Sequence, residues 1–280
     1  MYKIFDAHCH IYPEAISLKA VEAVDRFYDH LPAEHFDGTT ATLRRSGAEA
    51  GISHYLVHSV ATKPHQVSSI NRFIAGSMAA SRGRFTGMGT MHLDSDDLRR
   101  DFDELAALGL RGVKLHPDIQ RFNADDPRAM EIYAMCEEAG LPVCVHTGDY
   151  RYDYSNPPRI ANILRAFPKL KFIGAHFGGW SVWEEAARAL SDFPNIAVDS
   201  SSTLYAVKPE TVRELIRIWT PDRVMFGTDY PLWPQRRDID ALLALELDEK
   251  DYRKIFWDNA AALFEVKTTE RPIALSPSRP

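Results

Sequence analysis

The stretch FDAHCHIYP, residues 5–13, places two histidines one residue apart directly after a short apolar run. Side chains alternate between the two faces of a β-strand, so His8 and His10 would share one face and Cys9 would point to the other. Two imidazoles on one face can bind a single metal ion. A polar pair that meets solvent at a strand end has the same spacing, so this stretch alone leaves both interpretations open.

Seven further apolar or β-branched runs follow this one, and longer stretches with helical features separate them. The eight expected strands lie within residues 2–10, 53–60, 84–93, 110–117, 141–148, 170–179, 195–202 and 223–231. Strands that alternate with single helices form parallel βαβ units. Eight such units in a chain of 280 residues predict an α/β fold of the (β/α)8 TIM-barrel type.

The main alternative is a doubly wound open sheet, which often has a glycine-rich turn after its first strand. Here that turn reads HCHIYP, residues 8–13. Residues 125–140 illustrate the helical features, because Asp and Pro favour a helix start and Gly140 favours its end. Other helices are expected within residues 15–31, 42–50, 68–83, 156–168, 183–194 and 208–221.

One domain is expected over residues 1–266, followed by a Pro- and Ser-rich arm or tail at residues 267–280. A long insertion at about residues 12–38 follows the first strand. Connections between a strand and its helix are usually much shorter. Because the insertion begins beside His8 and His10, it is either a lid or substrate wall over the site or a purely structural excursion.

Composition limits the classes of function. The net charge of −6 argues against a nucleic-acid partner, and no apolar run is long enough to span a membrane. The N-terminal segment lacks the apolar region of a signal peptide, and the three cysteines are too few for a disulfide framework. We therefore expect a cytoplasmic protein that acts on a small-molecule substrate, with a homodimer left open.

Histidines and acids gather at the carboxyl ends of the expected strands, where the active sites of such barrels lie. These residues are His8, His10, His58, His92, Lys114, His116, His146, His176, Asp199 and Asp229. His146, His176 and Asp229 each follow an apolar run and precede a turn marked by Gly or Pro. Together with His8 and His10, they offer the ligand types that zinc and related divalent ions prefer.

Several other residues have weaker signals. His58 and His92 are expected to be histidines at the barrel rim that bond to the backbone. Asp199 either touches the substrate or caps the turn DSSS. Asp6 shares the face of His8 but lies deeper, so we expect it to support a ligand and not to be one. The remaining histidines are expected at the surface, and they are His30, His35, His54 and His65.

The motifs DAHCHIYP, GVKLHP, VHTGD, AHFGG and GTDYP, with the terminal IFWDNAAALF, resemble the amidohydrolase superfamily and specifically its amidohydrolase 2 branch. That branch includes aminocarboxymuconate semialdehyde decarboxylase, related aromatic-acid decarboxylases and lactone hydrolases. The resemblance extends from the first strand to about residue 266. H-x-H alone is a common motif, but H-x-H followed by His, His and Asp at successive strand ends is specific.

The resemblance implies a role for each of these residues. A divalent metal ion, most often Zn²⁺ but also Mn²⁺ or another ion, would be bound by His8, His10, His146 and Asp229. His176 would be the acid/base, and Asp229 would also accept a proton. A divalent ion lowers the pKa of bound water toward about 7, and an imidazole transfers protons in that range.

Lys114 leaves the number of ions open. In two-metal members of the superfamily, a strand-four lysine is carboxylated and bridges the ions, and His176 would then be a ligand. The branch that this chain resembles usually has one ion, so one is expected and two remain an alternative. With one ion, Lys114 would bind a substrate carboxylate or pair with a neighbouring acid.

Loops rich in aromatics and arginine suggest a pocket for a flat, anionic molecule, although such residues also pack loops without binding anything. Candidate substrate or second-metal residues are Lys114, His116, Tyr150, Arg151, Trp180 and Trp233. The expected reaction is hydrolysis of an amide, lactone or ester-like bond. Alternatives are non-oxidative decarboxylation of a small unsaturated or aromatic carboxylic acid at the same site, and a barrel that binds metal or ligand without catalysis.

Overall fold

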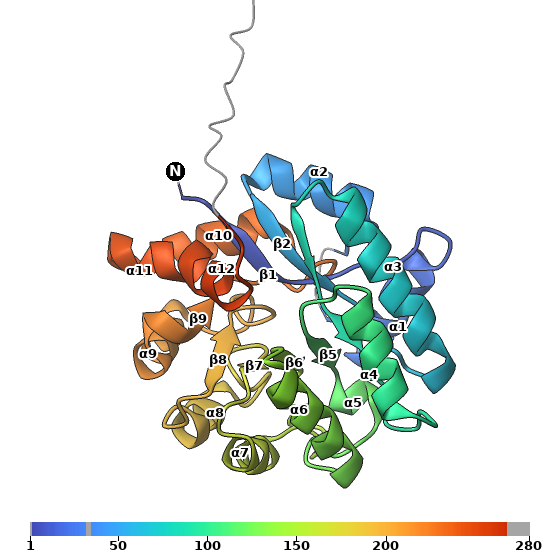
Figure 1. The fold of residues 1–280 in the computed structure, drawn as a ribbon. Coiled ribbons are helices and arrows are strands. Elements are labelled where there is room, and N and C mark those ends of the chain that lie inside the picture. Colours follow the sequence, from blue (N-terminus) through green and yellow to red (C-terminus); the bar gives the residue numbers. More distant parts are fainter. Residues whose placement is uncertain (1, 32–34, 268–280) are drawn as a thin grey trace, which may run out of the picture.

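The computed structural model describes residues 2–31 and 35–267, and in it a ring of parallel strands is surrounded by helices (Figure 1). The strands are β1 (Phe5–His10), β2 (His54–His58), β3 (Phe85–Gly87), β4 (Gly89–Thr90), β5 (Val113–Leu115), β6 (Val143–Val145), β7 (Phe172–Gly174), β8 (Ile196–Asp199) and β9 (Val224–Met225). Because β3 and β4 are two parts of one strand interrupted at Met88, the barrel has the eight predicted strands. The predicted TIM barrel is confirmed.

The barrel closes between its first and last strands. Neighbouring strands pair in parallel from β1 to β3 and from β4 to β9. The closing contacts lie between β1 and the segment after β9, where Cys9 and Tyr230 form a parallel bridge. The Asp229 amide donates to the His8 carbonyl at 2.9 Å. We call this junction the β1–β9 seam, and its backbone pairing sets Asp229 beside His8.

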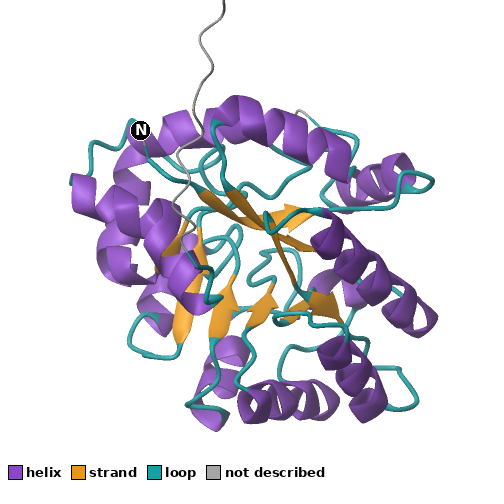
Figure 2. Ribbon diagram, turned by 45° about the horizontal axis from the view of Figure 1, so that its top comes forward, coloured by secondary structure: helices purple, strands orange, loops and turns teal. Residues whose placement is uncertain are grey.

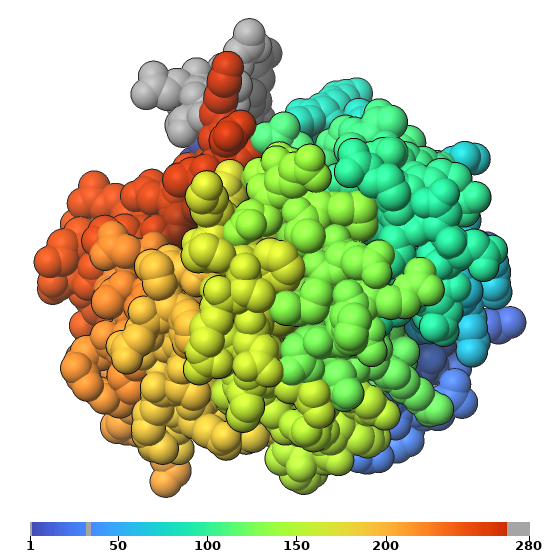
Figure 3. Space-filling view, turned by 60° about the horizontal axis from the view of Figure 1, so that its bottom comes forward, coloured from blue at the N-terminus to red at the C-terminus, as the bar shows by residue number. Residues whose placement is uncertain are grey.

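Most helices cover the outer face of the strands, whereas α1 and α5 contribute to the cavity at the barrel mouth (Figure 2). The helices of the described residues are α1 (Ser17–Phe27), α2 (Thr40–Ala50), α3 (Val67–Ala80), α4 (Leu98–Ala107), α5 (Pro117–Gln120), α6 (Pro127–Ala139), α7 (Pro157–Ala166), α8 (Trp183–Leu190), α9 (Pro209–Trp219), α10 (Gln235–Leu243), α11 (Glu249–Arg253) and α12 (Asn259–Leu263). In α6 the predicted signals act as expected, since Asp126 caps the first turn and Gly140 ends the helix with φ of 65°. Figure 3 shows this outer layer from another side, with successive segments following one another around the molecule.

The prediction that His54 lies at the surface is wrong. This residue begins β2 and is buried, its Nε2 lies 2.9 Å from Thr86 Oγ1, and its ring meets Phe5 edge-on. Barrel strands are covered on both faces, so alternation along them does not mark a solvent face. The other three histidines expected at the surface, His30, His35 and His65, are exposed.

Other sequence expectations have a direct structural counterpart. The three cysteines are buried and free of disulfides. Among the described residues, no helix has the length and apolar character needed to cross a bilayer. The predicted tail at residues 267–280 lies, apart from its first residue, outside the described residues.

Asp6 links the two strands of the seam. Its buried carboxylate accepts hydrogen bonds from Thr228 Oγ1 at 2.6 Å, from the Thr228 amide at 3.0 Å and from the His8 amide at 3.3 Å. Asp6 therefore connects the backbone at His8 to Thr228, and its support of a metal ligand stays a prediction.

We expect Asp6→Ala to lower the free energy of unfolding by at least about 3 kcal/mol, because three donors lose their acceptor and each buried donor left unsatisfied costs about 1–3 kcal/mol. Urea denaturation followed by circular dichroism measures the change. Asp6→Asn keeps one acceptor oxygen and should lose less. Equal stability of the alanine variant and the wild type would show that closure of the seam does not depend on Asp6.

Candidate metal centre

The predicted strand-end residues meet at the carboxyl-terminal mouth of the barrel. Asp229 Oδ1 lies 3.5 Å from Nε2 of both His8 and His10. His146 Nδ1 lies 3.0 Å from His176 Nε2, and Lys114 Nζ lies 3.2 Å from His8 Nε2. Polar atoms from five different strands or strand ends are therefore gathered in one small volume.

Three of these imidazoles are oriented in the same manner. His8 Nδ1 donates to Asp199 Oδ2 at 2.9 Å, His146 Nε2 donates to the Gly148 carbonyl at 3.1 Å, and His176 Nδ1 donates to the Ser201 carbonyl at 3.0 Å. A carboxylate or carbonyl only accepts, so each of these nitrogens carries the proton and the other nitrogen keeps a lone pair. Metal-binding histidines have this arrangement.

The protonation states also suit a cation. Burial, reinforced by neighbouring cationic groups, holds the pKa of His8, His10 and His146 well below its usual value. Burial also lowers the pKa of His176 to about 4 and raises the pKa of Asp229 to about 6, the latter against the hydrogen bond from Ser202. Near neutral pH the site therefore offers neutral imidazoles and a carboxylate, the forms that bind metal.

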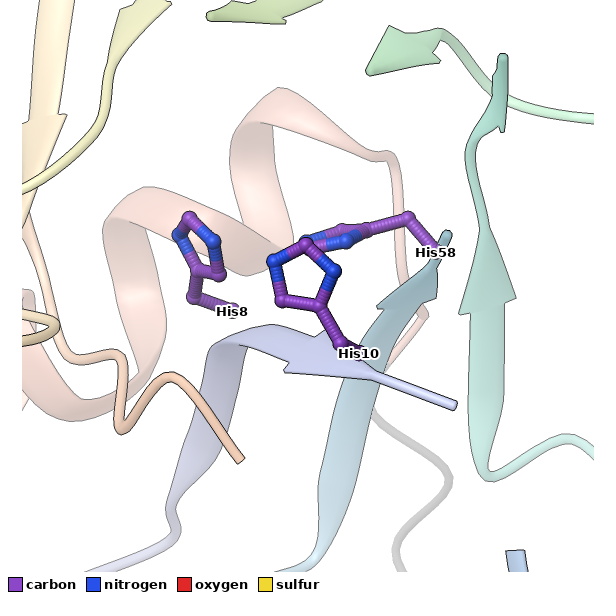
Figure 4. A group of neighbouring side chains, drawn as sticks. All are labelled: His8, His10 and His58. Carbon is purple, nitrogen blue, oxygen red and sulfur yellow. The ribbon is translucent and has the colours of Figure 1, made fainter. Parts of the chain in front are cut away.

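Ligand atoms lie within 4.8 Å of one another in three groups: His8, His10 and His58; His8, His176 and Asp199; and His116, Asp118 and His146. Figure 4 shows the first group, with the rings of His8 and His10 on β1 next to the ring of His58 on β2. The predicted ligand set of His8, His10, His146 and Asp229 draws on two of these groups and adds Asp229.

Lys114 lies at the base of the site. It is only 1% exposed, and its Nζ contacts His8 Nε2 at 3.2 Å and Cys144 Sγ at 3.6 Å. No carboxylate of the described residues pairs with it. A buried ammonium without an acid partner can bind an anion or a developing negative charge on oxygen.

A cavity of about 540 Å³ opens from these residues. Its base is formed by His10, Lys114, His116, His146, His176 and Asp229. Residues of the long insertion, including Ile16 and Phe27, form one wall, and Ile70 and Phe73 of α3 belong to another. The volume is within the range of small-molecule sites, so the insertion forms a wall of a pocket that can hold a substrate.

A sequence profile described as amidohydrolase matches residues 5–266. The chain belongs to the amidohydrolase family. This assignment covers nearly all the described residues and agrees with the barrel and its strand-end histidines.

Solved structures similar to this amidohydrolase share its fold over most of its length. An uncharacterized TIM-barrel protein from Bordetella bronchiseptica is 24% identical, with a TM-score of 0.80 and coverage of 94% of this chain and 98% of that one. A dihydroxybenzoic acid decarboxylase from Polaromonas sp. JS666, solved with bound manganese, is 17% identical, with a TM-score of 0.71 and coverage of 95% and 97%. A putative 2-pyrone-4,6-dicarboxylic acid hydrolase from Pseudomonas putida is 18% identical, with a TM-score of 0.67 and coverage of 95% and 99%.

In the amidohydrolase, His58 differs from its prediction. It was expected to bond to the backbone at the rim, but it is fully buried, and neither ring nitrogen has a partner among the described residues. Its ring meets those of His8 and His10 edge-on at centroid distances of 4.7 and 4.5 Å. His58 lies beside His10 because the register of β1 and β2 pairs these two residues.

His92 is a rim histidine as predicted, and its Nδ1 accepts a hydrogen bond from the Asp94 amide.

His116 and Asp199 support other residues of the site. His116 Nδ1 accepts from the Ile119 amide at 3.2 Å, and its Nε2 lies 2.9 Å from Tyr28 Oη, so both nitrogens are engaged. Asp199 caps its own turn, because its Oδ1 accepts from the Ser201 amide. The contact of Asp199 with His8 was not predicted, since nothing in the motif DSSS indicates which ring would reach it.

Four of the predicted substrate or second-metal residues are not among the residues that line the cavity. Tyr150 is 72% exposed, and Trp180 packs against Tyr28 and Tyr150. Arg151 forms ion pairs with Asp149 at 2.8 Å and with Asp29 at 3.0 Å. Trp233 is buried, with its Nε1 donating to Ser202 Oγ at 2.9 Å. These side chains pack loops together, whereas Lys114 and His116 do line the cavity.

Proposed function

We propose that this amidohydrolase is a metal-dependent hydrolase that cleaves an amide, lactone or ester-like bond of a small molecule. The observation that carries the proposal is the shared orientation of His8, His146 and His176, each with one nitrogen bonded to the protein and one lone pair in the site. One divalent ion would be held by His8, His10, His146 and Asp229. The homodimer remains a prediction.

The residues around the ion have separate tasks. When bound, a divalent ion polarises a carbonyl oxygen and makes a water molecule more acidic. His176, neutral because burial lowers its pKa to about 4, accepts the proton that the attacking water loses. Asp229 shares that role, and Lys114 stabilises negative charge on the substrate. His176 then returns the proton to the leaving group.

Non-oxidative decarboxylation is the second candidate. It is favoured by the Lys114 side chain, which lines the cavity and has no carboxylate partner among the described residues. Such a site can bind a carboxylate with few surrounding waters, and His176 can protonate the carbon that loses carbon dioxide. The similar solved structures include decarboxylases of aromatic acids as well as a putative hydrolase. The Polaromonas decarboxylase was solved with manganese, so Mn²⁺ is a candidate ion beside Zn²⁺.

Removal of the metal tests the proposal. Dialysis against a chelator should reduce turnover to background, and addition of Zn²⁺ or Mn²⁺ should restore it, with about one ion per chain measured by elemental analysis. Hydrolysis is assayed on lactones, esters and amides, and decarboxylation is assayed as carbon dioxide released from aromatic and unsaturated acids. Full turnover by verified metal-free protein would overturn the proposal, and carbon dioxide release without any hydrolysis would select the second candidate.

A further inference from the structure

We infer that the substrate carries a hydrocarbon part, an acyl chain or an apolar ring, that binds between α1 and α3 while its reacting group lies at the metal-site end of the cavity. This inference rests on the proposed function, because it assumes that the reaction takes place at the base of this cavity. It adds a hydrocarbon part to the expected anionic substrate, which makes that substrate amphipathic.

The wall formed by α1 carries the first part of the argument. Ile16, Ala20, Val24 and Phe27 line the cavity, at spacings of four, four and three residues. Residues so spaced lie on one face of a helix, so α1 turns an apolar stripe toward the cavity. The only charged residue of α1 in the lining is Lys19.

The other wall carries apolar residues as well. It includes Val60, Ile70, Phe73 and Ile119, with the uncharged polar residues Ser59, Thr62, Gln66 and Ser69 among them, and the other charged groups of the lining, Lys114 and Asp229, are at the base. A small polar substrate would leave most of this surface against water. A hydrocarbon part bound there would remove apolar surface of both protein and ligand from water, which favours binding.

The α1 wall is held in place, so the cavity is part of the folded structure. Arg151 donates to the Phe27 carbonyl at 2.7 Å and pairs with Asp29 at 3.0 Å, which connects the end of α1 to the loop after β6. The guanidinium also lies over the Phe27 ring at 5.0 Å. Tyr28, the next residue, contacts His116 at 2.9 Å. The end of α1 therefore lines the cavity and also contacts His116 at its base.

The test uses a series of saturated straight-chain carboxylates from acetate to octanoate, which have no hydrolysable bond. Their affinities for the wild-type protein are measured by calorimetry. Burying one methylene group favours binding by an amount equal to about a fourfold gain in affinity, so the affinity should rise about fourfold per carbon until the cavity is full. Affinity that does not change with chain length would overturn the inference.

Two cavity-filling variants locate the chain. Ala20→Trp and Ala23→Trp each place a large side chain in the lining and should cancel the gain for hexanoate and octanoate while acetate binding is unchanged. Leu18→Trp is the matched control, because Leu18 is on α1, is 64% exposed and is outside the lining. Thermal melting checks that each variant folds, and Val24→Phe serves if either tryptophan variant does not.

These outcomes separate the inference from the proposed function. An affinity that rises with chain length in all variants alike would place the hydrocarbon elsewhere and overturn the inference. The expected series together with full turnover by metal-free protein would support the apolar pocket while rejecting the metal-dependent reaction. An affinity that does not change with chain length, together with metal-dependent turnover, would reject the apolar pocket and support the metal-dependent reaction.

Discussion

Asp229→Asn should remove the bound ion and the turnover together. Asp229 is the carboxylate between His8 and His10, at 3.5 Å from each, and the amide of asparagine is a much weaker ligand. Turnover should fall by more than about 10⁴-fold, because a proton acceptor contributes about 10²–10⁴-fold and the ion's effect is lost with it. His10→Ala should likewise lower metal content and activity together, since a ligand is gone.

Metal content per chain, measured beside kcat/KM, checks this expectation. The matched control is Asp238→Asn, since Asp238 is a buried aspartate of α10 that pairs with Arg237 at 2.8 Å and, within the described residues, forms no hydrogen bond or ion pair with a histidine. This control should keep its ion and its activity. An Asp229→Asn protein that retained about one ion per chain would mean that Asp229 is not a ligand.

His176→Ala should separate catalysis from metal binding. If His8, His10, His146 and Asp229 hold one ion, the loss of His176 leaves about one ion per chain but lowers kcat by about 10²–10⁴-fold, the usual contribution of a general acid/base. His54→Gln is the control. His54 is a buried histidine at the first residue of β2, whereas the candidate site lies where the strands end. That substitution should leave kcat close to the wild-type value.

The same measurement distinguishes one ion from two. In the two-ion alternative, wild-type protein would hold nearly two ions per chain, and both His176→Ala and Lys114→Ala would lower the count toward one. That result would place His176 among the ligands and reject the one-ion assignment. Lys114→Ala in a one-ion enzyme should instead raise KM for anionic substrates and leave the metal content unchanged.

The barrel and the strand-end residues could be predicted from the sequence because both depend on local pattern. Each strand is a short apolar run, and parallel strands that alternate with helices bring their carboxyl ends to one mouth. His8, His10, His146, His176 and Asp229 all follow such runs, so their convergence follows from the topology. The spacing of residues along the chain was therefore enough to predict that these side chains lie together.

Side-chain surroundings could not be predicted in the same way. His58 and His92 have the same kind of position at strand ends, yet only His58 packs between two imidazoles and has no hydrogen-bond partner among the residues described. The role of Asp199 depends on its Oδ2 reaching His8, 191 positions away in the chain. Contacts of this kind depend on the completed barrel.

The loop aromatics show a second limit. Arg151 resembles an anion-binding residue in the sequence, but two aspartates and the surrounding rings already satisfy its guanidinium. Composition indicates which residues are available to a pocket, whereas tertiary packing decides which of them line it. The α1 wall was anticipated only as an insertion of unusual length, because its apolar stripe has meaning only once the opposite wall is known.

The β1–β9 seam separates the proposed metal ligands, so a bound ion would also affect the stability of the closed barrel. His8 and His10 stand on one side of this junction and Asp229 on the other, and the seam residues Asp6 and Thr228 are 222 positions apart. Closing a loop over so long a separation has a large entropy cost, which the contacts across the seam must offset. An ion bound by all three would link the two sides of this junction, and its binding free energy would stabilise the closed barrel. The same ion would then contribute both to the reaction and to the stability of the closed barrel.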